Sequence, residues 1–161
     1  MEDDVIIREY RKEDLDEISN IIVRNMLEVN SKDYGLKEME EYIKPFTKER
    51  IADTFSNRTK IWVAIKNNKI VGTAGLEADW SKIKDTYWVL SVFTMPEYHN
   101  QGIGRKLMNK LEDYAHDIKA KKIIIPASIT GNGFYYKLGY KYINNEKVLN
   151  SNGHYMMEKD L

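Results

Sequence analysis

A glycine-containing turn followed by a helix is the part of this sequence whose residue types best suit chemistry. Residues 91–108 read SVFTMPEYHNQGIGRKLM, with Gly102 and Gly104 between a β-branched, aromatic run and a helical pattern. Glycine lacks Cβ, so the backbone can approach an anion closely, and a helix start offers unpaired N–H groups and a positive dipole end. Arg105 and Lys106 add positive charge. The stretch predicts a phosphate-binding turn, for which an ordinary tight strand–helix turn is the alternative.

The charge balance and the absence of cysteine exclude several other functions. Lys+Arg and Asp+Glu each number 25, which argues against a strongly basic nucleic-acid binder. The chain has no cysteine, which removes thiolate nucleophiles and Cys-based zinc sites, and its three histidines show no ligand spacing, so we expect no metal. No apolar run approaches the roughly 20 residues that span a bilayer, and the N-terminus MEDDVIIREY lacks a signal-peptide plan. We therefore expect a cytoplasmic protein that binds neither membrane nor nucleic acid.

Apolar periodicity predicts the elements that must position the turn. Strands are expected at residues 5–10, 60–66, 70–78, 87–94, 122–125, 141–149 and 155–159. Helices are expected at residues 12–29, 36–42, 47–55, 102–118 and 133–138, with a break at residues 30–35. The order predicts one α/β domain over residues 1–161 with a mixed sheet and flanking helices. Three consecutive strands disfavour a doubly wound nucleotide-binding fold, which would alternate strand and helix.

Two short motifs follow the fourth and fifth predicted strands. They read HNQGIG over residues 99–104 and YYKLGY over residues 135–140. With the element order and the opening VIIREYRKEDLDEI, they resemble the GCN5-related N-acetyltransferase (GNAT) superfamily over nearly the whole chain. The first is similar to the family's acetyl-CoA pyrophosphate loop, Q/R-x-x-G-x-G/A, with His99 in place of Gln or Arg. The second is similar to Y-x-x-x-G-F, and the Asn that often precedes it is here Ser128.

The resemblance implies an α/β (α+β) fold with a mostly antiparallel sheet of about six to seven strands. The fourth and fifth strands would splay apart, and acetyl-CoA would fill the gap. Backbone groups of residues 92–94 would pair with the pantetheine arm, and amides of residues 101–105 would hold the pyrophosphate. The residues thus assigned to acetyl-CoA are Val92, Phe93, Thr94, Asn100, Gln101, Gly102, Ile103, Gly104, Arg105 and Ser128.

The implied reaction is attack of a neutral amine on a thioester, which requires an acid and a base. Tyr135 stands at the family's position for the general acid that protonates the departing thiolate; its neighbour Tyr136 would point about 100° away on a helix. Glu77 is the tentative base, with Asp79 as an alternative that also counts as a substrate candidate. For both Glu77 and Asp79 a solvated surface carboxylate is the plainer interpretation. Glu28 and Tyr34 are substrate-wall candidates, and for Tyr34, as for the other aromatics near it, packing is the plainer interpretation. His154 could titrate near neutrality, although a histidine beside a surface turn is the plainer interpretation.

The expected function is transfer of an acetyl group from acetyl-CoA to a primary amine, with a small molecule preferred as the acceptor. Two alternatives stay open: a peptide or protein amine as the acceptor, and a non-catalytic module that binds or senses acetyl-CoA. A homodimer through the C-terminal strands or the exposed sheet edge is compatible with the sequence, which does not decide it.

Overall fold

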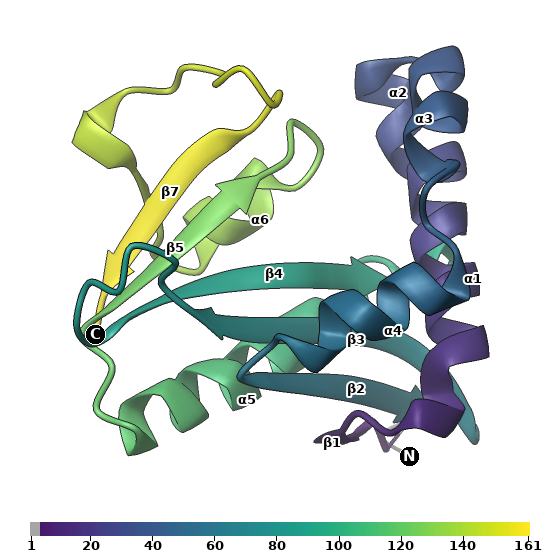
Figure 1. Ribbon diagram of the computed structural model, residues 1–161, viewed down its shortest axis with the longest axis horizontal. Coiled ribbons are helices and arrows are strands. Elements are labelled where there is room, and N and C mark those ends of the chain that lie inside the picture. The colour runs from purple at the N-terminus through teal and green to yellow at the C-terminus, as the bar shows by residue number, and fades with distance from the viewer. Residues whose placement is uncertain (1–3) are drawn as a thin grey trace.

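One seven-stranded sheet organises the computed structural model, which describes residues 4–161 (Figure 1). The spatial order is β1-β2-β3-β4-β5-β7-β6, and every neighbouring pair is antiparallel except β4 and β5, which are parallel. This arrangement confirms the predicted mixed, mostly antiparallel α/β fold. The strands are β1 (Ile6–Glu9), β2 (Lys60–Lys66), β3 (Lys69–Ala78), β4 (Thr86–Thr94), β5 (Lys122–Ala127), β6 (Lys141–Tyr142) and β7 (Tyr155–Asp160).

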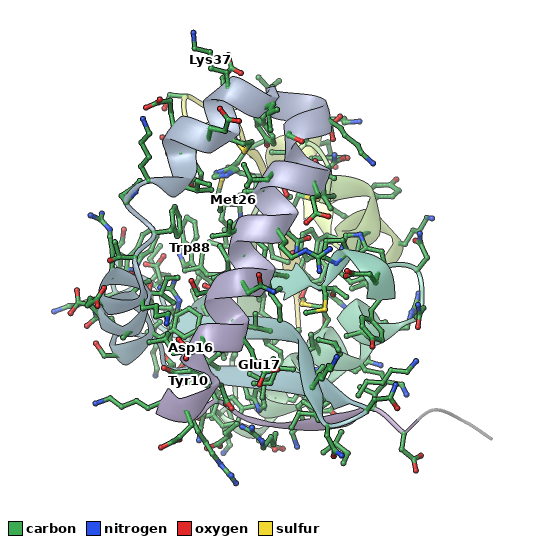
Figure 2. The ribbon with its side chains drawn as sticks, turned by 90° about the vertical axis from the view of Figure 1, so that its right-hand side faces the viewer. Tyr10, Asp16, Glu17, Met26, Lys37 and Trp88 are labelled. Carbon is green, nitrogen blue, oxygen red and sulfur yellow. The ribbon has the colours of Figure 1, made fainter. Side chains whose placement is uncertain are left out.

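Helices cover both faces of the sheet, because its central strands are apolar on both sides. The helices are α1 (Leu15–Asn25), α2 (Ser31–Tyr34), α3 (Leu36–Ile43), α4 (Lys48–Ser56), α5 (Ile103–Asp117) and α6 (Asn132–Lys137). Successive side chains of a strand point to opposite faces; thus Val63 joins the core beneath α1, α3 and α4, whereas Trp62 joins the core beneath α5 and α6. Figure 2 shows α1 rising from Asp16 and Glu17 near its base toward Met26, on the way to the end of the molecule where Lys37 lies.

The parallel strands β4 and β5 part after three paired positions. The last pair is Trp88 with Ile124, after which β4 continues beside β3 alone and β5 beside β7 alone. A β-bulge lies just beyond the parting: the β3–β4 register shifts between Thr73 and Gly75, and Ser91 on the opposite strand has a φ of 57°. Such a bulge bends a strand and increases its twist. Figure 1 shows β5 and β7 rising away from β4. The predicted splay is therefore confirmed.

Two predicted boundaries are wrong. The chain does not break after Val29, because a π-helical turn, η2 (Met26–Asn30), leads into α2, and the helical path ends at Gly35 with a φ of 95°. The strand predicted at residues 141–149 shrinks to β6 and one isolated bridge from Leu149 to Tyr155. Asn144 and Asn145, at φ 58° and 56°, end β6 by adopting the left-handed conformation that asparagine tolerates. Within residues 4–161 no helix is long and apolar enough to cross a bilayer.

Candidate active site

A cavity of about 740 Å³ lies where β4 and β5 part. This volume is within the usual range for small-molecule sites. Residues 89–94 of β4 line it on one side, and the β5–α6 connection with Tyr135 lines it on another. The start of α5 closes one end, and η2, α2 and α3 lie at the other together with the loop before β7. Figure 1 shows α2 and α3 at the top of the molecule, across from the arm formed by β5, α6 and β7.

The α5 end of the cavity suits an anion. Gly102 caps the helix with a φ of 79°, and a Cβ built on it would meet nothing within 4 Å. Gly104 is needed for a different reason, since a Cβ there would lie 3.0 Å from the Phe134 ring. The first N–H groups of a helix have no intrahelical partner, and here they border the cavity together with Arg105 and Lys137. The end of the cavity formed by Asn100, Gly102, Gly104, Arg105 and Lys137 is hereafter called the phosphate end.

The free edge of β4 offers backbone groups to the gap. Phe93 pairs with Thr73 of β3, so alternation turns the backbone groups of Val92 and Thr94 toward the cavity. The Thr94 carbonyl oxygen already accepts two hydrogen bonds, from Asn25 Nδ2 at 2.8 Å and from His99 Nε2 at 2.8 Å. The Thr94 N–H and both backbone groups of Val92 are therefore the groups that this edge of β4 can offer to a ligand, and Phe93 also lines the cavity.

His99, which stands where the family motif has Gln or Arg, forms a hydrogen bond to the end of β4. A carbonyl oxygen only accepts, so Nε2 of His99 carries the proton and donates to Thr94. The buried Asn25 reaches the same oxygen from α1, where its amide also donates to the Ile21 carbonyl at 2.9 Å. Asn25 and His99 thus fix the end of β4, and the sequence pattern gave no signal for Asn25 beyond a polar residue in an apolar stripe.

Tyr135 is 8% exposed and lines the cavity from α6. Its ring packs edge-on against Phe134 and Tyr140, with centroids 5.1 and 6.1 Å away. Its hydroxyl has no hydrogen-bond partner among residues 4–161. Burial raises the pKa of Tyr135 well above its ordinary value, so the hydroxyl keeps its proton at neutral pH. Tyr136 points outward, is 59% exposed and stacks on Tyr142.

Tyr34 ties two sides of the cavity together. Its hydroxyl donates to the Gly153 carbonyl at 2.6 Å and accepts from the Ile129 N–H at 2.8 Å. Beside it, the Thr130 hydroxyl donates to Asp33 at 2.6 Å. The tip of α2 is therefore bonded to both loops of the opposite arm. Tyr34 both lines the cavity and bridges it.

The acidic candidates lie away from the cavity. Glu77 is buried in an ion pair with Arg58, 3.1 Å from its Nη1, and also accepts from Trp80 Nε1. Asp79 accepts from Trp88 Nε1 at 2.8 Å, and this bond lowers the pKa of Asp79. Glu28 pairs with Arg24 at 2.7 Å on the outer surface. The structure does not bring these three carboxylates to the lining.

The side chains of two residues assigned to acetyl-CoA, Gln101 and Ser128, are engaged within the protein. The Gln101 side chain also lies outside the lining, where it bonds Lys66 at 3.2 Å and the Glu97 carbonyl. Ser128 lines the cavity, but its hydroxyl accepts from the Gly131 N–H at 2.8 Å and so shapes the turn into α6. Residues 4–161 contain no cluster of three or more metal-binding side chains.

The lining contains residues that the sequence motifs did not indicate. Met26, Val29, Met39, Tyr42, Asn152 and His154 come from three separate segments. Their meeting depends on the η2–α2 turn and on the short β6, the two places where the predicted boundaries were wrong. Among the lining residues that the structure describes there is no Asp or Glu, and the full positive charges belong to Arg105 and Lys137.

Comparison with known proteins assigns the fold and the family. Residues 29–161 match the family model described as acetyltransferase (GNAT) domain. No curated protein sequence matches at a significant level. The chain is similar to the crystal structure of PaiA N-acetyltransferase from Thermoplasma acidophilum in complex with coenzyme A, with a TM-score of 0.81, 20% identity, and 98% and 99% of the two chains covered.

Two further solved structures have the same fold. A GNAT superfamily phosphinothricin acetyltransferase from Sinorhizobium meliloti in complex with AcCoA has a TM-score of 0.77 and 18% identity, over 98% of this chain and 88% of that one. An aminoglycoside 6′-acetyltransferase type Ii has a TM-score of 0.64 and 21% identity, over 96% of both chains. At such identities the likeness concerns the fold alone.

Proposed function

This chain belongs to the GNAT acetyltransferase family, and on that basis we propose that it transfers the acetyl group of acetyl-CoA to a small primary amine. The observation that carries the proposal is that one cavity joins the glycine-containing start of α5 to the hydroxyl of the buried Tyr135, which has no hydrogen-bond partner among residues 4–161. The first feature suits the pyrophosphate of acetyl-CoA, and the second suits its thioester. Two of the structural neighbours contain coenzyme A or acetyl-CoA, which supports the same donor.

The residues present fit acetyl-CoA. The open space over Gly102 and the unpaired N–H groups of residues 102–105 would receive the pyrophosphate, with Arg105 adding charge. Val92 and Thr94 would pair with the pantetheine arm, because their backbone groups face the gap between the strands. A backbone N–H on this edge would also stabilise negative charge that develops on the thioester oxygen.

Tyr135 is proposed as the general acid. When the amine nitrogen bonds to the acetyl carbon, the carbon–sulfur bond breaks and the thiolate needs a proton. The Tyr135 hydroxyl holds a proton at neutral pH, because burial raises its pKa. It donates to no other group within residues 4–161, so its proton is free for the sulfur. Tyr136 does not fill this role because it faces solvent.

The test is a measurement of coenzyme A release with the wild type and with Tyr135→Phe, supplied with acetyl-CoA and a panel of amines. Release that depends on both the amine and the Tyr135 hydroxyl supports the proposal. Calorimetric binding of acetyl-CoA without turnover of any amine would instead favour the non-catalytic binding module. The absence of carboxylates from the lining is the observation that keeps this second candidate under test.

A further inference from the structure

The end of the cavity away from α5 has a neutral, largely apolar lining. We call it the acceptor half and define it by Met26, Val29, Tyr34, Met39, Tyr42 and His154. The neutral amides of Asn30 and Asn152 lie beside these residues. Two acidic residues of the neighbouring helical segments are engaged elsewhere, Glu28 by Arg24 and Asp33 by Thr130. A substrate with several ammonium groups would therefore lose its hydration here without gaining an opposite charge.

His154 is held in the acceptor half by its neighbours in the chain. Its backbone N–H donates to Asn150 Oδ1 at 3.0 Å, and its carbonyl accepts from the Asn150 N–H at 2.9 Å. On one side Gly153 accepts from the Tyr34 hydroxyl, and on the other Tyr155 pairs with Ala127 of β5. His154 thus precedes the strand that pairs with the end of β5, and it lines the same cavity as the connection that leads from β5 to Tyr135. Its ring nitrogens make no hydrogen bond to another of the residues 4–161.

The two histidines of the lining have different positions. His99 donates from Nε2 to Thr94 and follows β4 into the phosphate end. His154 lies at the opposite end, so it is the histidine that an acceptor amine would meet. Burial lowers the pKa of His154, which leaves it neutral and able to accept a proton at pH 7. Of the titratable side chains on α2, α3 and β7, Tyr34 and Tyr42 line the cavity with His154, and Asp33 and Tyr155 lie close enough to Tyr34 to act on it electrostatically. The other charged residues of α2, α3 and β7 lie outside the lining: Lys32, Lys37, Glu38, Glu40, Glu41, Glu158, Lys159 and Asp160.

We propose that the acceptor is a primary amine carried on an apolar or aromatic body and that His154 takes the proton which its ammonium group must lose. This rests on the proposed acetyl transfer. The ammonium gives one proton to His154, which passes it to solvent, and the neutral nitrogen then bonds to the acetyl carbon as the carbon–sulfur bond breaks. The second proton leaves the nitrogen after that bond has formed. It replaces the proton that Tyr135 gives to the sulfur, so charge and atoms balance.

The acceptor class is tested by comparing phenethylamine and tryptamine with spermidine and kanamycin at equal acetyl-CoA. We expect kcat/KM for the two aromatic amines to exceed that for the polycations by about tenfold or more, which corresponds to one modest interaction. Higher kcat/KM for spermidine or kanamycin would overturn the acceptor class. Calorimetry of phenethylamine with the protein saturated in coenzyme A gives a readout that needs no turnover; the absence of binding would also overturn it.

The role of His154 is tested with His154→Gln, and His116→Gln on the exposed end of α5 is the matched control. We expect kcat to fall about 100-fold, with little change in KM, and the acidic limb of the wild-type pH–rate profile to disappear. The melting temperature and the acetyl-CoA affinity should stay close to wild type, because the side chain makes no hydrogen bond to residues 4–161. An unchanged kcat and pH profile would overturn the assignment. If the wild type itself fails to bind acetyl-CoA, the proposed function fails first, which separates the two claims.

Discussion

The hydroxyl of Tyr34 donates a hydrogen bond of 2.6 Å to the carbonyl oxygen of Gly153, and this bond spans the cavity. It joins α2, at the end of the N-terminal helical segment, to the loop that precedes His154. The Tyr34 hydroxyl also accepts from the Ile129 N–H, so one side chain fixes two loops. The shape of the acceptor half therefore depends on a residue that need not touch the reacting atoms.

Removal of this hydroxyl should loosen the acceptor half while sparing acetyl-CoA binding. In Tyr34→Phe the Ile129 N–H and the Gly153 carbonyl lose a partner, which should lower the free energy of unfolding by about 1–2 kcal/mol. We expect KM for the amine to rise several-fold and acetyl-CoA affinity to stay unchanged, as measured by steady-state kinetics and calorimetry. Tyr114→Phe on α5 is the control. Equal effects on the affinities for amine and acetyl-CoA would contradict a role confined to the acceptor half.

The proposed general acid Tyr135 has a simple test, because its hydroxyl has no hydrogen-bond partner in the described part of the chain, residues 4–161. Tyr135→Phe keeps the ring that packs on Phe134 and Tyr140, so stability should change little. Loss of the proton donor should lower kcat by about 100-fold or more, while acetyl-CoA still binds. Tyr136→Phe, on the exposed face of α6, should retain wild-type kcat. Full activity of Tyr135→Phe would remove the residue from the mechanism.

The glycine turn should tolerate no side chain at its left-handed position. Gly102 has a φ of 79°, where an L-residue costs about 1–2 kcal/mol, and a methyl group would stand in the space proposed for the pyrophosphate. We expect Gly102→Ala to weaken acetyl-CoA binding about tenfold or more, measured by calorimetry. Gly133→Ala is the control, because a Cβ there meets nothing within 4 Å and its φ is not positive. Comparable losses in both variants would argue against a phosphate cradle.

The sequence was sufficient for the parts of the site that follow one strand directly. Gly102 and Gly104 lie beside the cavity as expected, because a strand, a turn and a helix that are contiguous in the chain keep their order in space. The central strand was also predictable, since residues 87–94 form its most apolar run. Tyr135 could be placed because it is the first residue of the second motif and lies on the short helix predicted there.

The acceptor half could not be predicted, because it is assembled from segments far apart in the chain. Tyr34 meets Gly153 across 119 residues, and no local pattern encodes such a contact. The same applies to Glu77: its position near the end of β3 says nothing about Arg58, which lies in the connection between α4 and β2 and pairs with it. Local turn chemistry also misled at residues 30–35, where the Ser31 hydroxyl bonds the Leu27 carbonyl at 2.6 Å and the helical path continues.

Asp14 should make the protein sensitive to acid. Burial alone would raise the pKa of Asp14, but two hydrogen bonds of 2.8 Å from Arg8 and one from the Arg11 N–H outweigh it and lower the pKa. A depressed pKa in the folded state means that stability is present above the unfolded value of about 3.9 and is lost as pH falls through the folded value. We expect Asp14→Asn to be less stable than wild type at pH 7.

Titration of that stability difference with pH provides the check. The free energy of unfolding of wild type and of Asp14→Asn is measured by chemical unfolding from about pH 7 to pH 2. The difference between the two should be constant near pH 7 and become smaller below about pH 4. Asp16→Asn, an exposed neighbour on α1, should show a much smaller difference from wild type. A gap that stays constant down to pH 2 would show that the ionised carboxylate of Asp14 is not what stabilises the fold.

Glu77 should contribute to stability and leave the chemistry unaffected. Its buried carboxylate pairs with Arg58 and accepts a hydrogen bond from Trp80 Nε1, and the Arg58 Nη2 donates to the hydroxyl of the bulge residue Ser91 at 3.4 Å. In Glu77→Gln the charge of Arg58 loses its partner, so we expect the free energy of unfolding to fall by about 1–3 kcal/mol. At a temperature where the variant stays folded, kcat and the pH–rate profile should match wild type, because the side chain lies outside the cavity lining. If kcat instead fell as far as in Tyr135→Phe and the acidic limb of the profile vanished, Glu77 would be the base and His154 would not.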